Sequence, residues 1–270
     1  MTIIGKLTKN TSAICVLFLC ILSAFLIFHT QYSFCMSDEG LYISHAKRLY
    51  FGSHLIIDEW HPTQFYSPIL LPFYAAYRFF SGSDDGVIRF FRIVAVLISS
   101  VSSILFFIET KKKFNGFISF CAAALLMVFS RANIAGASYY NLNLHFSVLS
   151  FIFVSKAIKR QGKKAMICSI ASGVFISLAV LCQAFSAILF IGLIVCLLIN
   201  KTTRKCGCGI LGTVSLMGAV YTDTSAGYAF HGAKTSDGGT LTAGSYWTCP
   251  QCKTRNPMSK IECKECGQIR

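Results

Sequence analysis

The stretch YSPILLPFYAAYRFF, residues 66–80, decides how many times this chain crosses a membrane. It is apolar and rich in aromatic side chains, but it carries Pro68, Pro72 and Arg78. It also falls short of the roughly 20 apolar residues that a spanning helix needs. Amphipathic aromatic segments of this kind lie in the interface between lipid and water. We therefore predict that residues 66–80 form an interfacial helix and do not cross the bilayer.

The composition is that of a membrane protein. Of the 270 residues, 54% are hydrophobic and 13% are charged, and the mean hydropathy is +0.59. Soluble domains have roughly 25% charged residues. In a soluble protein the net charge of +14 would suggest nucleic-acid binding, but here Lys and Arg gather between apolar runs. Because such loops face the cytoplasm in membrane proteins, the charge predicts topology and not a nucleic-acid partner.

Six apolar runs are candidates for membrane spans. They cover residues 13–32, 87–108, 117–129, 142–154, 165–181 and 184–199. No small-residue cleavage site follows the first run, so we interpret it as a retained signal anchor. If residues 66–80 stay outside, the basic clusters at 111–113, 156–164 and 201–205 all fall on the cytoplasmic side. The sequence thus predicts an all-α polytopic membrane protein with six transmembrane helices, an outer loop over residues 33–86, and cytoplasmic N- and C-termini.

The predicted outer loop is rich in acidic residues. It holds six of the chain's eleven: Asp38, Glu39, Asp58, Glu59, Asp84 and Asp85. A carboxylate at the membrane surface can take the proton of an acceptor hydroxyl or hold a divalent cation. It also lies within reach of a phosphate headgroup whose tail stays in the lipid. The alternative is an ordinary solvated loop in which these acids have no chemical role.

The order of short motifs in this loop resembles the start of GT-C glycosyltransferases, in particular the protein O-mannosyltransferase and aminoarabinose-transferase branch. The matching positions are Asp38-Glu39 after the first span, His61-Pro62, the glycine-rich turn at 82–86, and Arg89 at the start of the second span. Further on, FSRANIAGASYYNLNLHFSVLSF (129–151) and ISLAVLCQAFSAILF (176–190) resemble the third-to-fourth span loop and the fifth-to-sixth span hairpin. The resemblance covers about residues 14–200.

The resemblance implies transfer of a sugar from a polyprenyl-phosphate donor to an acceptor on the outer face. Asp38, with Glu39 beside it, would act as the catalytic base or position a divalent cation. The residues implied for substrate binding are Asp58, Glu59, His61, Arg89 and Arg131. Arginine suits a lipid phosphate because its guanidinium donates two parallel hydrogen bonds. The alternatives are arginines that snorkel to the interface and a loop histidine without a role.

Two departures from the family pattern stand out. Thr63 and Gln64 replace the second Pro and the Leu of the family's His-Pro-Pro-Leu-like stretch. Family enzymes continue for several more spans, whereas here the apolar character ends near Asn200. A complete donor cavity would then need a second subunit.

The remainder of the chain has a different composition. Residues 201–244 are rich in Gly, Ser and Thr and are predicted to be a linker, because CGCGILGTVSLMGAV (206–220) is short and glycine-rich for a span. Residues 245–270 contain Cys249, Cys252, Cys263 and Cys266, two Cys-x2-Cys pairs separated by ten residues. Four thiolates at this spacing suit a tetrahedral structural zinc ion, and a short domain without a core needs the metal to fold. The alternative is two disulfides.

This cysteine motif resembles the Ran-binding-protein type of zinc finger. Trp247 and Asn256 occupy the remaining positions of that pattern. The resemblance implies a protein or RNA partner, with Trp247 stacking on a base and Arg255 and Asn256 contacting base edges. A zinc ribbon with a purely structural role fits equally. The rival to the glycosyltransferase reading is therefore a non-catalytic membrane-anchored zinc-finger protein that binds a cytoplasmic partner.

Overall fold

The computed structural model describes residues 3–32, 39–53, 64–130, 136–200, 203–230, 233–234, 240–241, 246–248, 251–252, 255–257 and 266. This part of the chain is helical as far as Phe230 and forms short strands beyond it. The helices are α1 (Ile3–His29), α2 (Glu39–Tyr50), the 3-10 turn η1 (Gln64–Tyr66), α3 (Ser67–Ser81), α4 (Val87–Thr110), α5 (Gly116–Val128), α6 (Tyr139–Ile158), α7 (Gly162–Cys182), α8 (Ser186–Ile199) and α9 (Arg204–Phe230).

Within the described residues, four helices are long and apolar enough to cross a membrane. They are Thr11–His29 within α1, and α4, α6 and α7. Helices α5 and α8 are apolar but have only 13 and 14 residues, about 20 Å at 1.5 Å per residue. The hydrocarbon layer is about 30 Å thick. The four long apolar helices confirm the predicted class of a helical membrane protein. The count of six spans stays a prediction.

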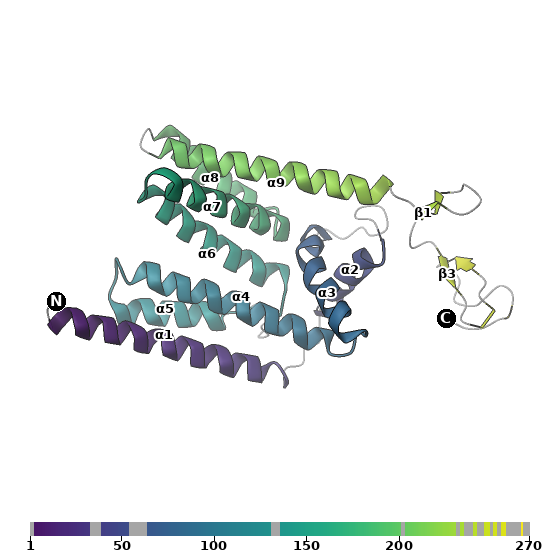
Figure 1. The fold of residues 1–270 in the computed structure, drawn as a ribbon, viewed down its shortest axis with the longest axis horizontal. Helices are drawn as coiled ribbons and strands as arrows, with labels where there is room; N and C mark the ends of the chain where they lie inside the picture. Colours follow the sequence, from purple (N-terminus) through teal and green to yellow (C-terminus); the bar gives the residue numbers. More distant parts are fainter. Residues whose placement is uncertain are drawn as a thin grey trace.

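The long helices form two groups that meet where α4 contacts α6 (Figure 1). Helices α1 and α5 pack on α4, and α7, α8 and α9 pack together beside α6. Polar side chains join the helices: the Ser100 hydroxyl donates to Ser23 Oγ at 2.7 Å between α4 and α1. Ser102 Oγ lies 2.7 Å from His145 Nδ1 between α4 and α6. Such hydrogen bonds hold helices together where no water competes for the polar groups.

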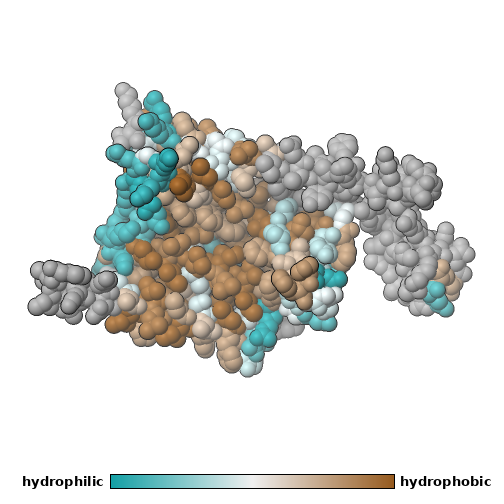
Figure 2. Space-filling model, in the orientation of Figure 1, coloured by the Kyte–Doolittle hydropathy of each residue, from teal (hydrophilic) through white to brown (hydrophobic). Residues whose placement is uncertain are grey.

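The surface of the bundle separates apolar from charged residues. Figure 2 shows a broad apolar area over the helices and a hydrophilic zone at one end of the molecule. At that end α4 finishes before the lysines at 111–113, and α6 ends at Ile158, within the basic cluster at 156–164. We call this end the basic end; it is the arrangement that the loop charges predict.

Helices α2 and α3 lie together at the opposite end (Figure 1). Ser67, Leu70 and Tyr74 are the buried residues of α3, at the spacing of one helix face. Helix α3 stops at Gly82 and α4 starts after Gly86, with φ of 69° and 81° respectively; residues with a Cβ rarely adopt this left-handed backbone. With 15 residues, α3 is about 22 Å long, and the interfacial position of residues 66–80 stays a prediction.

Where a linker was expected, the structure contains helix α9. Glycines on both helices bring α7 and α9 close together: a Cβ on Gly173 of α7 would lie 2.6 Å from Thr213 Cβ of α9, and one on Gly209 of α9 would lie 3.1 Å from Ser169 Cβ of α7. Small residues at such contacts let helix backbones approach closely in membranes. Composition alone predicted a linker over residues 201–244, and within it Gly207 and Gly209 pack against neighbouring helices.

Helix α9 runs in the same direction as α7. It begins at Arg204, shortly after α8 ends at the basic end, and its residues Met217 and Gly218 line one cavity with Val180 and Leu181 near the end of α7. It therefore extends toward the end of the molecule where α2 and α3 lie (Figure 1). The side of the membrane on which the chain beyond Asn200 lies stays a prediction.

Two short hairpins follow α9. Strand β1 (Ala233–Lys234) pairs antiparallel with β2 (Thr240–Leu241). Strand β3 (Tyr246–Thr248) pairs antiparallel with β4 (Arg255–Pro257), and the register places Thr248 opposite Arg255. The second hairpin therefore encloses residues 249–254, which carry the first Cys-x2-Cys pair.

Candidate functional site

A buried ion pair joins the start of α2 to α4. Arg92 Nε donates to Glu39 Oε1 at 2.7 Å, and Arg92 Nη2 donates to Glu39 Oε2 at 2.6 Å. Arg92 Nη1 also donates to the backbone carbonyl of Thr30, at 3.0 Å. All three residues are buried. The two-pronged geometry is the strong form of a carboxylate–guanidinium contact.

Four segments of the chain meet at this pair. Glu39 is the first residue of α2, where the positive end of the helix dipole favours a carboxylate. On its other side lies Gly136, because a Cβ at that position would be 3.5 Å from Glu39 Oε1. Asn141 Nδ2 donates to the Gly136 carbonyl at 3.1 Å, which fixes this segment to α6. The end of α1, the start of α2, α4 and the approach to α6 are thereby held together.

Tyrosines pack beside the pair. Tyr42, one turn along α2 from Glu39, contacts Tyr66 of η1 and Tyr139 of α6 edge-on, with ring centroids 5.7 Å apart in each case. Edge-to-face packing of this kind is favourable beyond the burial of the rings. The tyrosines thus connect α2 to the 3-10 turn and to the start of α6 at the same end of the bundle.

A second polar network anchors α2 to α3 and to the turn before α4. The Tyr74 hydroxyl donates to Asp84 Oδ1 at 2.7 Å, and Lys47 Nζ lies 2.7 Å from Asp84 Oδ2. Arg78 Nη1 is 3.4 Å from the same carboxylate. Hydrogen bonds from Lys47 and Tyr74 hold the pKa of Asp84 below its ordinary value, and burial raises the pKa of Tyr74. Because the Asp84 pKa is lowered, its contribution to stability is present at neutral pH and is lost as the pH falls through that pKa.

The predicted site residues are only partly described. Glu39 is buried in the ion pair, and Arg89 is exposed on α4, one turn before Arg92. The predicted residues Asp38, Asp58, Glu59, His61 and Arg131 lie outside the described residues. Both carboxylate oxygens of Glu39 accept from Arg92, so its observed contacts are those of a positioning residue.

The predicted zinc ligands are described in part. Cys252 and Cys266 are exposed, whereas Cys249 and Cys263 lie outside the described residues. The described part of the chain contains no group of three or more His, Cys, Asp or Glu side chains placed to hold a metal ion. The four-cysteine site therefore stays a prediction, with the β3–β4 hairpin around the first pair as its structural context.

The sequence pattern did not single out Arg92, Gly136 or Asn141. A signal for Arg92 exists, because it is a charged residue inside the apolar run 87–108. Such residues in membrane segments face the bundle interior and pair with an opposite charge. The partner was not evident, since 53 residues separate Glu39 from Arg92 in the chain. Gly136 has a role only through its closeness to Glu39, which no local pattern records.

Comparison of the chain with protein-family models, with curated protein sequences and with solved structures gave no match.

Replacing Glu39 by Gln should destabilise the fold by about 3–5 kcal/mol, because it leaves the buried Arg92 guanidinium without its counter-charge. The measurement is unfolding of the purified protein in detergent. A double variant, Glu39→Gln with Arg92→Met, should recover part of the loss, since the second change removes the unpaired charge.

Arg89→Gln is the matched control for this experiment. It removes an exposed arginine from the same helix, so the change in stability should stay within about 0.5 kcal/mol. Equal, small effects of Glu39→Gln and Arg89→Gln would show that the pair does not hold α2 in place.

Proposed function

We propose that this chain is a membrane glycosyltransferase-like protein that transfers a sugar from a polyprenyl-phosphate donor to an acceptor at the face where α2 and α3 lie. The single observation that carries the proposal is the buried Glu39–Arg92 pair. It anchors the chain directly after Asp38, the residue that the GT-C resemblance assigns as base. A proton acceptor needs a fixed position to contribute to catalysis.

The proposed roles follow from charge and position. Asp38 takes the proton of the acceptor hydroxyl or positions a divalent cation, and Glu39 acts through Arg92 as a positioning residue. Arg89 is exposed near the start of α4, where its guanidinium is available to a lipid phosphate. Arg131 is the second proposed phosphate ligand. Asp58, Glu59 and His61 belong to the same proposed substrate-binding loop.

Asp38→Asn should lower transfer by about 10²–10⁴-fold, because the amide keeps the shape of the side chain but cannot accept the proton. The assay uses the full chain in vesicles with labelled polyprenyl-phosphate sugars, and it measures label moved to the acceptor. Asp85→Asn is the matched control, since Asp85 is an exposed acid of the same predicted loop and should leave transfer unchanged. Full activity of Asp38→Asn would remove Asp38 from the mechanism.

We further propose a topology with the N-terminus in the cytoplasm and α1, α4, α5, α6, α7 and α8 as spans. The lysines that follow α4 and α6 support this orientation. Helix α9 packs alongside α7 and α8, which are proposed spans. This packing favours α9 as a further crossing of the membrane. The tail then emerges on the face of Asp38, in place of the cytoplasmic C-terminus that the loop charges alone suggested.

Cysteine labelling distinguishes these arrangements. In a chain whose native cysteines are replaced, single cysteines are placed at Ser53, Gln161 and Gln251, and intact cells are treated with a reagent that cannot cross membranes. Ser53 and Gln251 should react, and Gln161 should react only after permeabilisation. Labelling at Gln161 in intact cells would overturn the proposed spans, and protection at Gln251 would show that α9 does not cross.

A second candidate function is that of a membrane-anchored zinc finger that binds a cytoplasmic protein or RNA partner, and it requires that α9 does not cross, as protection at Gln251 would show. The observation that favours it is the β3–β4 hairpin, which closes a loop around the first Cys-x2-Cys pair. Four thiolates, those of Cys249, Cys252, Cys263 and Cys266, would suit one tetrahedral zinc ion. Four thiolates leave no open position for catalysis, so the metal would be structural.

Purified full-length protein should carry about one zinc ion per chain, the stoichiometry of a closed four-cysteine site. Cys252→Ser should reduce the zinc content measured by elemental mass spectrometry. Cys196→Ser is the matched control, because Cys196 is an exposed cysteine of α8 and its loss should leave the zinc content unchanged. Two disulfides and no zinc in the protein would exclude the metal site.

A further inference from the structure

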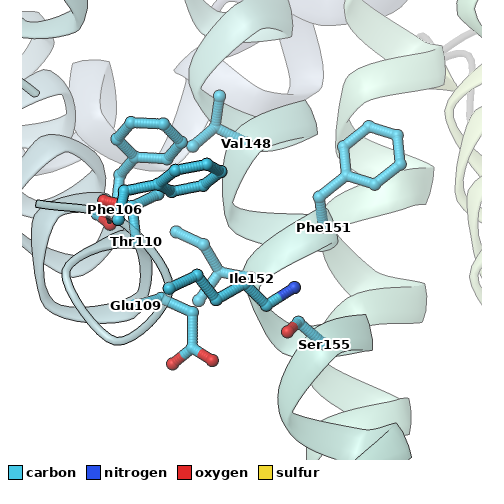
Figure 3. A pocket seen from close by; sticks show the side chains of 9 residues that line it. Phe106, Glu109, Thr110, Val148, Phe151, Ile152 and Ser155 are labelled. Carbon is cyan, nitrogen blue, oxygen red and sulfur yellow. Dashed lines mark hydrogen bonds between the residues drawn. The ribbon is translucent and has the colours of Figure 1, made fainter. Parts of the chain in front are cut away.

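At the basic end, a cavity of about 270 Å³ lies between α4 and α6. Its walls come from the last turns of α4 and the residues after it, and from residues 148–155 of α6. Figure 3 shows Phe106, Val148 and Phe151 toward one end of the cavity, and Glu109 and Ser155 toward the other. On both α4 and α6, the polar end of the cavity is the end nearer the lysines at 111–113 and 156–164. The cavity is therefore graded from apolar, deeper in the bundle, to polar near its charged end.

The charged end of the cavity has an excess of positive charge. The Glu109 carboxylate is fully engaged, with Lys112 Nζ 2.6 Å from Oε2 and Lys159 Nζ 2.9 Å from Oε1. Lys113 lines the cavity and is exposed, and among the described residues it has no carboxylate within ion-pair distance. One carboxylate, that of Glu109, thus stands against three ammonium groups, those of Lys112, Lys113 and Lys159.

We propose that this cavity binds an anionic phospholipid of the bilayer. One acyl chain lies against Phe106, Val148 and Phe151, and the headgroup phosphate accepts hydrogen bonds from Lys113 and the neighbouring lysines. Phe114 and Phe151, which also line the cavity, are 62% and 41% exposed, so the cavity can be reached from the lipid side of the bundle. Basic pockets between membrane helices attract anionic headgroups in this way.

The apolar wall distinguishes a lipid from a free anion. Inorganic phosphate would contact the lysines but would gain nothing from the phenylalanine-lined part, which is apolar and better filled by hydrocarbon than by water. The site lies at the opposite end of the bundle from Glu39 and Arg92, so it is separate from the proposed transfer site. It binds lipid whether or not the chain transfers a sugar.

The test uses the full chain in vesicles of phosphatidylcholine with and without phosphatidylglycerol, and native mass spectrometry counts the lipids that stay bound. The wild type should retain phosphatidylglycerol in preference to phosphatidylcholine. Lys113→Gln should reduce that preference by roughly fivefold, the effect of one lysine at an anionic membrane surface. Lys163→Gln is the control, because Lys163 is an exposed lysine at the same end that does not line the cavity.

Two variants test the cavity walls. Ser155→Phe places a ring in the polar part of the cavity and should reduce retention of phosphatidylglycerol. Phe114→Ala removes an exposed wall, a change compatible with folding, and should act in the same direction. The proposal is overturned if Lys163→Gln equals Lys113→Gln, since diffuse surface charge would then explain the binding. It is also overturned if neither wall variant reduces retention, or if inorganic phosphate alone displaces the lipid.

Discussion

A carboxylate and a guanidinium buried at the end of an apolar bundle have to remain together, and much of this structure depends on one such pair. Glu39 and Arg92 share two hydrogen bonds of 2.7 and 2.6 Å, and Arg92 also holds the carbonyl of Thr30. Loss of either partner would leave an unpaired charge where water does not compensate it. The position of α2, and with it the tyrosine contacts around Tyr42, follows from this pair.

The two ends of the bundle have different chemistry. At one end, acids are held by contacts within the protein. Glu39 forms an ion pair with Arg92, and Asp84 forms one with Lys47 and accepts a hydrogen bond from Tyr74. At the other end, Glu109 pairs with Lys112 and Lys159, and Lys113 lines the cavity between α4 and α6. The first arrangement fixes a protein segment close to a proposed catalytic acid, and the second leaves positive charge available to the membrane surface. The same residue types therefore serve rigidity at one end and attraction of anions at the other.

Glycine has two distinct effects in this chain. At Gly82 and Gly86 it permits the left-handed backbone that turns α3 into α4. At Gly173 and Gly209 it permits contact between α7 and α9 that a side chain would obstruct. In a list of residue types these positions look alike, and Gly209 lies in the stretch whose composition predicted a linker. Only the neighbour that each glycine meets distinguishes a turn from a packing surface.

The sequence by itself determined the helical membrane class, the location of the apolar helices and the collection of lysines at one end, because these depend on local hydrophobicity, length and charge. It also marked Asp38-Glu39 and Arg89 as a candidate site. Only the tertiary structure decided that Arg92 is the arginine that meets Glu39, that Gly136 closes over the pair, and that α9 is a packed helix. Those outcomes depend on contacts between residues far apart in the chain, and a local pattern records the preference of a residue for an environment but not the partner it meets there.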